Sequence, residues 1–356
     1  CMGRMYEASR CTEISSGTSP TPASAPALAP SRLVTSRVSC CSETVLPVPG
    51  PARTSTGWAA CAPWRRRGEG ATTWLASSSM SEMAEMLSVA DVRRLLSEAD
   101  IDPKKSLGQN FVVDPNTVRR IARLSGVGEG SRVIEIGAGL GSLTLALAET
   151  GASVVAIETD RTLIPILNSI VGDRAEIIEA DVRSLSWNEM LPTPGWDLVA
   201  NLPYNIATNV VLTVLDEVPA VTRLLVMVQQ EAGERIAASV GDAAYSGVSV
   251  RVALRGNASI VGHVSPSVFY PQPRVSSALV AIERVERSVE KHIEDELIDL
   301  VRIAFNQRRK MLRKSLKGRV EENILESAGI PPTSRPEEVE LDRWINLAQE
   351  SAKIEL

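Results

Sequence analysis

Hydrophobic positions from residue 88 onward follow two periods, and their alternation predicts an α/β fold. Short apolar runs suited to buried strands alternate with stretches in which apolar residues recur every three to four positions, as on one face of a helix. The predicted strands are residues 132–136, 152–157, 175–179, 196–200 and 223–228, and the predicted helices are residues 88–99, 142–150, 207–216 and 231–239, with a further helix beginning at Asp114-Pro115. This order is typical of a parallel sheet covered by helices.

The pattern changes after residue 240. Residues 248–260 and 277–285 alternate as two further strands would, and residues 295–317 have the period of one long helix. The loop between the two strands holds three prolines and the adjacent rings of Phe269 and Tyr270. These rings are compatible with a contact to a planar ligand and also with packing beneath the loop.

Residues 1–80 have no hydrophobic period and are rich in Ser, Thr, Pro, Ala and Arg, a composition typical of disorder. A transit peptide, a functional disordered tail and a sequence upstream of the true start all fit this composition. The first residue is Cys, and Met80, Met83 and Met86 precede the first periodic helix, which favours the third interpretation.

The charge of the chain is unevenly distributed. Its 356 residues, 44% of them hydrophobic, suffice for a large core and two domains, and the formal net charge is −5. Residues 1–79 carry eight Arg and four acids, which leaves the remainder at about −9. Such an acidic body binds nucleic acid only where basic residues gather.

One basic cluster satisfies that condition. Seven cations and no acid lie between Phe305 and Arg319, namely Arg308, Arg309, Lys310, Arg313, Lys314, Lys317 and Arg319. In a continuous helix Arg309, Arg313 and Lys317 would share one face. We predict a phosphate-binding surface, although a solvated helix face has the same signature.

Several kinds of chemistry are excluded by residue usage. All five cysteines fall within the first 61 residues, and His263 and His292 are the only histidines. The body therefore has no disulfide, no Cys-based zinc site and no Cys nucleophile, and we expect no metal. No run of eighteen apolar residues occurs, so we expect no membrane span.

A glycine turn follows the first buried strand. Residues 132–136 lead into Gly137-Ala138-Gly139-Leu140-Gly141 and then a helix, an arrangement that admits a nucleotide-like ligand close to the backbone. A dinucleotide fingerprint requires glycine or alanine where this chain has Ser142, so the spacing favours an adenosylmethionine binder.

Two acids come directly after the next two strands. Glu158 is placed to accept hydrogen bonds from ribose hydroxyls, and Asp181 could accept from the adenine amino group of the cofactor. Either alone could be a solvated acid at a strand end. Together they describe one crevice at the carboxyl edge of a parallel sheet.

The strand at 196–200 ends in Asn201-Leu202-Pro203-Tyr204. Methyl transfer to an exocyclic amine needs acceptors for the amine hydrogens. The Asn201 side-chain oxygen and the Leu202 carbonyl can serve, because Pro203 stiffens the turn and offers no N–H. Tyr204 would stack on the extruded base. Alternatively, the motif is only a common way to end a strand, and the Tyr204 ring packs in the hydrophobic core.

The loop at residues 104–114 is rich in Gly and polar residues. It could be a plain connector between helices or a flap over the cofactor, and composition does not separate these possibilities.

Five motifs, in order, resemble the ribosomal RNA small-subunit adenine-N6,N6-dimethyltransferases, which modify two adjacent adenines near the 3′ end of small-subunit rRNA. They cover residues 88–350 and comprise residues 105–111, 137–141, 201–204, 264–269 and 304–310. Residues 1–80 have no counterpart in this family.

The resemblance implies a class I adenosylmethionine-dependent methyltransferase, with a Rossmann-like seven-stranded sheet in residues 86–286, a small all-helical RNA-binding domain in residues 287–356 and an extension in residues 1–85. It implies S-adenosyl-L-methionine contacts at Asn110, Val112, Gly137, Gly139, Glu158, Asp181 and Asn201, with the 104–114 loop as the flap. Val112 stands where the family often has Leu, a backbone contact. Catalytic roles fall to Asn201, Leu202, Tyr204 and Phe269, the last preferred over Tyr270.

The implied partner is small-subunit rRNA or a pre-small-subunit particle, bound by a monomeric cytoplasmic enzyme, or by an organellar one if residues 1–80 are a transit peptide. Two other functions remain open: the related resistance enzymes that methylate large-subunit rRNA, and a non-catalytic RNA-binding assembly factor. The Phe305–Leu316 stretch resembles the small-subunit family. The intact Glu158, Asp181 and Asn201 argue against loss of catalysis.

Overall fold

The computed structural model describes residues 86–104 and 107–353, which belong to one compact unit. The expectations for residues 1–85 fall outside the described residues.

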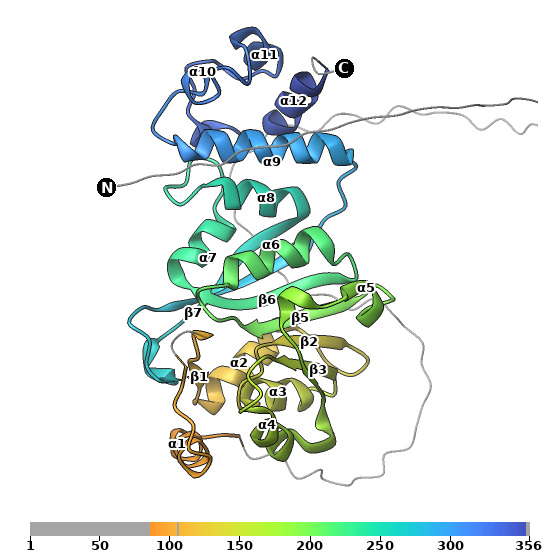
Figure 1. Ribbon diagram of the computed structural model, residues 1–356, viewed down its shortest axis with the longest axis vertical. Helices are drawn as coiled ribbons and strands as arrows, with labels where there is room; N and C mark the ends of the chain where they lie inside the picture. Colours follow the sequence, from red (N-terminus) through yellow and green to blue (C-terminus); the bar gives the residue numbers. More distant parts are fainter. Residues whose placement is uncertain (1–85, 105–106, 354–356) are drawn as a thin grey trace, which may run out of the picture. The chain divides into compact units, whose positions relative to one another are not determined.

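A seven-stranded sheet in the order β4-β3-β2-β5-β6-β9-β7 forms the centre of the fold (Figure 1). The strands from β4 to β6 run parallel, and β9 is antiparallel to both of its neighbours. The strands are β2 (Arg132–Ile136), β3 (Ser153–Glu158), β4 (Glu176–Glu179), β5 (Trp196–Asn201), β6 (Val221–Gln229), β7 (Gly256–Val264) and β9 (Ser277–Arg284). The predicted fold class is therefore confirmed, as are the five strands before residue 230.

Two hydrophobic cores cover the two faces of this sheet. One packs α6 and α7 against the sheet, and the other packs α2, α3 and α4 against the opposite face. The helices of this part of the chain are α2 (Pro115–Ser125), α3 (Ser142–Ala148), α4 (Ile164–Val171), α5 (Trp187–Met190), α6 (Ala207–Glu217) and α7 (Gln230–Ala237). Short 3-10 turns are η2 (Gly172–Arg174), η3 (Val182–Ser184), η4 (Pro266–Val268) and η5 (Pro336–Glu338).

A small two-stranded sheet joins the segment before α2 to the proline-rich loop. β1 (Phe111–Val112) pairs antiparallel with β8 (Phe269–Tyr270). Helix α1 (Val89–Glu98) begins at a capping box formed by Ser88 and Asp91 and packs beside β1. Segments about 160 residues apart in the sequence are thereby brought together.

The prediction of a strand at residues 248–260 was wrong over its first half, because α8 (Gly247–Arg255) is a helix. Val248 and Val252 pack into the core beneath α6, whereas Val250 and Leu254 pack into a third core formed with the C-terminal helices. A helix buried on two sides has apolar residues at every second position, so its sequence imitates a strand.

The C-terminal residues form α9 (Lys291–Asn306), α10 (Leu312–Ser315), α11 (Glu322–Ser327) and α12 (Leu341–Ala352). The predicted single helix over 295–317 is interrupted, because α9 ends at Asn306. The chain then turns so that Leu312 and Leu316 return to the third core, and the Leu312 N–H donates to the Ser334 carbonyl at 2.7 Å. The domain boundary at residue 286 stays a prediction, and α8 contributes to cores on both sides of it.

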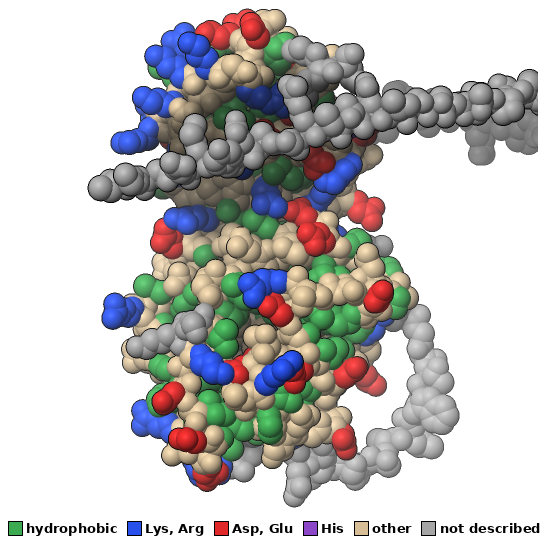
Figure 2. Space-filling view, viewed as in Figure 1, with side chains coloured by type: hydrophobic (Ala, Val, Ile, Leu, Met, Phe, Trp, Pro, Cys, Tyr) green, Lys and Arg blue, Asp and Glu red, His purple; other side chains and the backbone are tan. Residues whose placement is uncertain are grey.

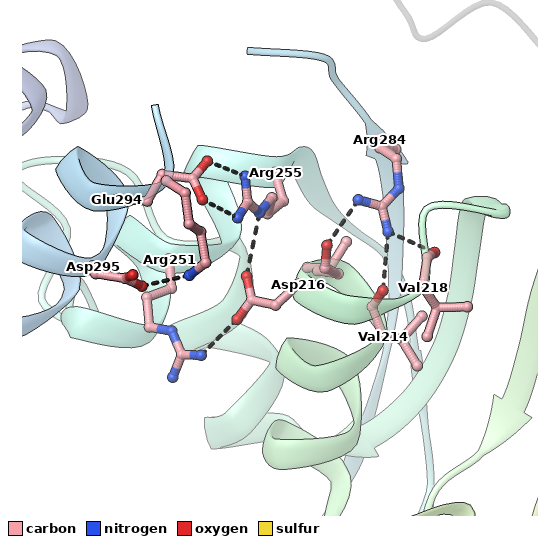
Figure 3. A network of polar contacts seen from close by, with 10 residues as sticks. Val214, Asp216, Val218, Arg251, Arg255, Arg284, Glu294 and Asp295 are labelled. Carbon is pink, nitrogen blue, oxygen red and sulfur yellow. Dashed lines mark hydrogen bonds and ion pairs between the residues drawn. The ribbon is translucent and has the colours of Figure 1, made fainter. Parts of the chain in front are cut away.

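Ion pairs connect α6, α8 and α9 (Figure 3). The Arg255 guanidinium donates to both carboxylate oxygens of Glu294, at 2.5 and 2.7 Å, and to Asp216 at 3.3 Å. Arg251 donates to the same Asp216 at 2.7 Å. Nearby, Arg284 donates to carbonyls at the C-terminal end of α6, including that of Val214, and satisfies groups that a helix end leaves unpaired.

Candidate active site

A cavity of about 260 Å³ lies at the carboxyl edge of the parallel strands. Segments from the loop before β1, the turn after β2, the end of β3, the loop after β4 and the turn after β5 line it. Of the predicted site residues, it brings together Asn110, Val112, Gly137, Gly139, Glu158, Asp181, Asn201, Leu202 and Tyr204. It does not bring in Phe269 or the basic cluster.

The glycine turn has a backbone conformation that residues with a side chain rarely adopt. Gly137, Gly139 and Gly141 have φ values of +76°, +59° and +87°, in the left-handed region that favours glycine. A Cβ on Gly139 would also lie 3.0 Å from the Phe111 ring. The backbone can therefore approach a bound ligand closely.

The Glu158 carboxylate is tied to this turn. One oxygen accepts from the Gly139 N–H at 2.7 Å, and the other accepts from the N–H groups of Thr159 and Asp160, each at 2.9 Å. Burial raises the pKa of Glu158 against the opposing effect of these hydrogen bonds. The carboxylate is thus held rigidly, and its remaining lone pairs can accept from vicinal hydroxyls.

Asp181 lines the cavity after the neighbouring strand β4, beside Arg183. The guanidinium donates to both carboxylate oxygens, with its Nη2 2.6 Å from one of them, and these hydrogen bonds lower the pKa of Asp181. The carboxylate is therefore ionised and oriented, in a state suited to accept from an amino group.

Asn201 sits at the last position of β5. Its side-chain nitrogen donates to the Asn110 carbonyl at 3.1 Å, which assigns the orientation of the amide. Its Oδ1 and the Leu202 carbonyl accept no hydrogen bond from any other described residue. Both predicted acceptors remain available at the cavity.

The ring of Tyr204 is fixed through its hydroxyl, which is 2.7 Å from the Ser277 Oγ. Burial raises the pKa of this phenol, so the hydroxyl stays protonated. A neutral ring held at both ends of its side chain is a suitable stacking platform.

The structure places Phe269 outside the lining of the cavity. Successive side chains of β8 point to opposite faces, and Phe269 takes the inward one, so its ring is 4% exposed and packs in the core with α2. Tyr270 faces the other way, with the Arg93 guanidinium 5.1 Å from its ring centroid. The role of Phe269 as a second stacking ring stays a prediction.

The basic cluster is less uniform than its sequence suggests. Because α9 ends at Asn306, Arg309, Arg313 and Lys317 do not share one helix face. Arg308 pairs with Glu337 at 2.8 Å, and Arg313 lies 4.0 Å from Glu322.

Four cations, Arg309, Lys310, Lys314 and Lys317, are exposed and form no ion pair with a described residue. We call these four the α10 patch. Blue side chains gather where α10 lies in the space-filling view (Figure 2).

Three polar residues near the cavity were not predicted from the sequence. Glu135 is buried in β2, and burial raises its pKa to about 8, opposed by a hydrogen bond from Thr144 at 2.6 Å. Ser142 has a buried hydroxyl with no partner among the described residues, and it lines the cavity. Asp160 accepts hydrogen bonds from the side chains of Lys104 and Gln109. An acid inside an apolar strand is a local signal that could have identified Glu135.

These residues fit S-adenosyl-L-methionine. The glycine turn gives close backbone approach, Glu158 and Asp181 offer oriented carboxylates, and the Ser142 hydroxyl is a buried polar group that lacks a partner among the described residues. No group of His, Cys, Asp or Glu in the described part of the chain could hold a metal ion. None of the helices in residues 86–104 and 107–353 is long and apolar enough to cross a bilayer.

Known proteins resemble this chain in sequence and in fold. The sequence pattern of the family described as ribosomal RNA adenine dimethylase matches residues 102–353. The ribosomal RNA small subunit methyltransferase A of Bifidobacterium adolescentis is 39% identical over 284 residues, which are 74% of this chain and 93% of that protein.

Two solved structures share the fold. A dimethyladenosine transferase from Plasmodium falciparum superposes with a TM-score of 0.59 at 24% identity, over 68% of this chain and 98% of that one. The 23S rRNA methyltransferase ErmE superposes with a TM-score of 0.55 at 24% identity, over 68% of this chain and 99% of that one. The family match and the sequence identity confirm the resemblance drawn from the five motifs. The chain therefore belongs to the ribosomal RNA adenine dimethylase family and is an adenosylmethionine-dependent RNA methyltransferase.

Proposed function

We propose that this enzyme transfers methyl groups to N6 of two adjacent adenines near the 3′ end of small-subunit rRNA and so takes part in maturation of that subunit. The observation that carries the proposal is the Asn201 amide. Its nitrogen is held by the Asn110 carbonyl at 3.1 Å, and its oxygen is left as an acceptor beside the glycine turn.

The amine of adenine is a poor nucleophile, because its lone pair is delocalised into the ring. The Asn201 Oδ1 and the Leu202 carbonyl accept hydrogen bonds from its two N–H groups and favour the pyramidal amine of the transition state. Pro203 brings no competing N–H to this turn, and Tyr204 stacks on the base. The bound donor supplies an electrophilic methyl group on a sulfonium.

The remaining cavity residues hold the donor. Glu158 accepts from the ribose hydroxyls, Asp181 accepts from the adenine amino group, and the backbone of Asn110, Val112, Gly137 and Gly139 packs against the rest. The fixed carboxylate of Glu158 and the ionised carboxylate of Asp181 support these roles.

The partner proposed for the α10 patch is the phosphate backbone of the rRNA within a pre-small-subunit particle. Four exposed cations that make no ion pair within residues 86–104 and 107–353 stand out on a body whose net charge is about −9. We propose a monomer, acting in the cytoplasm.

The deciding experiment incubates the full chain with labelled donor and, separately, unmethylated small and large ribosomal subunits. We expect label in small-subunit RNA only, recovered as N6,N6-dimethyladenosine at two neighbouring positions. Label in large-subunit RNA would transfer the assignment to the resistance-type enzymes. Donor binding without transfer to either subunit would contradict the proposed reaction.

A further inference from the structure

A buried carboxylate next to the cavity organises the loop that carries Asn110. Asp160 is 4% exposed, and its Oδ1 accepts from the Lys104 ammonium and from the Thr162 hydroxyl, each at 2.7 Å. Its Oδ2 accepts from the Gln109 side-chain nitrogen at 2.8 Å. Partners from both sides of the loop thus converge on one side chain.

The amide of Gln109 links these partners to one another. Its nitrogen donates to Asp160, and its oxygen accepts from the backbone N–H of Lys104 at 2.7 Å. Both ends of the amide are engaged, so Gln109 has one orientation. The next residue, Asn110, is the one whose carbonyl receives the Asn201 amide at 3.1 Å.

The backbone of Asp160 connects the same network to the donor side of the cavity. Its N–H donates to the Glu158 carboxylate at 2.9 Å, and the other oxygen of that carboxylate accepts from Gly139. Asp160 itself does not line the cavity. It lies between the acid proposed to hold the ribose and the loop that orients the catalytic amide.

Asp160 keeps its charge under all ordinary conditions. Burial by itself raises the pKa of this group, but hydrogen bonds from Lys104, Thr162 and Gln109 outweigh burial and hold the pKa at about 2.

We propose that Asp160 is a positioning residue that couples the donor site to Asn201, by fixing Gln109 and thereby the Asn110 carbonyl that orients the catalytic amide. This inference rests on the proposed function only for the role of Asn201. The hydrogen-bond network itself is independent of what the enzyme methylates.

A reciprocal exchange of acid and amide tests the coupling. Asp160→Asn places an amide nitrogen against the Gln109 nitrogen, two donors facing each other. Gln109→Glu places two carboxylates together. In the double variant, Glu at 109 accepts from Lys104 N–H and from the new Asn, whose oxygen accepts from the Lys104 ammonium. The double variant thus restores the hydrogen bonds and the net charge.

We expect each single variant to lower kcat about tenfold or more, and the double variant to return within about threefold of wild type, as for directly coupled neighbours. Hydrogen exchange at the amides of residues 107–113 should accelerate in the single variants and recover in the double variant. The KM for the donor should change less than kcat, which separates the effect from a loss of donor binding.

Thr162→Val is the matched control. It removes a hydroxyl that donates to the same carboxylate and that accepts from the Lys104 ammonium at 3.4 Å. The hydrogen bonds from Lys104 and Gln109 to Asp160 stay in place, so kcat and exchange at 107–113 should stay near wild type. Should either single variant fail to fold, Lys104→Met removes one partner from the exposed side. We then expect several-fold losses in kcat and faster exchange.

A double variant whose loss equals the product of the two single losses would overturn the proposal, as would single variants with wild-type kcat and exchange. Failure of the proposed function looks different. Wild-type protein would then transfer no methyl to small-subunit RNA, while the exchange measurements would still report whether Asp160 holds the loop.

Discussion

Replacement of Asn201 by alanine separates the catalytic role of this side chain from its structural role. The substitution removes the hydrogen bond from the side-chain nitrogen to the Asn110 carbonyl, and it removes Oδ1 from the cavity. The first loss should lower the free energy of unfolding by about 1 kcal/mol, as is usual for one hydrogen bond.

The second loss acts on the transition state. Removal of one oriented acceptor from a preorganised site costs on the order of 10²–10³ in rate, or about 3–4 kcal/mol of activation free energy. Because Glu158, Asp181 and the glycine turn are left unchanged, we expect the dissociation constant of the donor to stay within about tenfold of wild type. The rate should therefore fall far more than stability or donor affinity.

Three measurements on the same preparation test this expectation. Single-turnover transfer from labelled donor to unmethylated small subunits gives the rate, equilibrium binding gives the donor affinity, and urea unfolding gives the stability. Asn209→Ala is the matched control, because Asn209 is exposed on α6 and does not line the cavity. Transfer by Asn201→Ala at the wild-type rate would refute the assigned role, and a collapse of stability would make the side chain structural.

Further predictions concern charge. Glu135→Gln should make stability less dependent on pH, because the carboxyl of the unfolded chain ionises above its ordinary pKa of 4.5 whereas the folded one keeps its proton to a pKa of about 8. Wild-type stability therefore falls as pH rises from about 4.5 to about 8, by roughly 3–5 kcal/mol at most. Equal pH slopes of wild type and variant in urea unfolding would contradict this. Arg255→Met leaves the carboxylate of Glu294, which is 7% exposed, without its bidentate partner. The free energy of unfolding, measured in urea, should fall by about 3–5 kcal/mol, and adding Glu294→Gln should recover part of it. A fall below about 1 kcal/mol would show that stability does not need the pair. Changing Arg309 and Lys310 to Gln should weaken rRNA binding. The slope of log affinity against log salt concentration should fall in magnitude by about 0.7–0.9 for each phosphate that the protein no longer neutralises. An unchanged slope would show that neither residue contacts the RNA.

The sequence by itself determined the parallel sheet and the order of its chemistry. Local period is sufficient for this, because strands buried on both faces read as short apolar runs, and the glycine turn, Glu158, Asp181 and Asn201 each follow their own strand directly. The carboxyl ends of parallel strands meet at one edge, so sequence position alone implied that these groups line one cavity.

Tertiary structure decided what depends on contacts between distant segments. Helix α8 has a strand-like sequence because it packs between two cores, and α9 ends at Asn306 because Leu312 must return to the third core. Neither core is visible from a local window of sequence. Phe269 turned inward for the same reason, since the pairing of β8 with β1 sets which face each ring takes.

The hydrogen-bond network around Asp160 shows most directly what a local window of sequence does not predict. Its partners Lys104 and Gln109 lie 56 and 51 residues away in the chain, and no period or spacing relates them. A buried charge becomes stable only when the fold brings donors to it, so its role is a property of the folded molecule and not of the sequence around it.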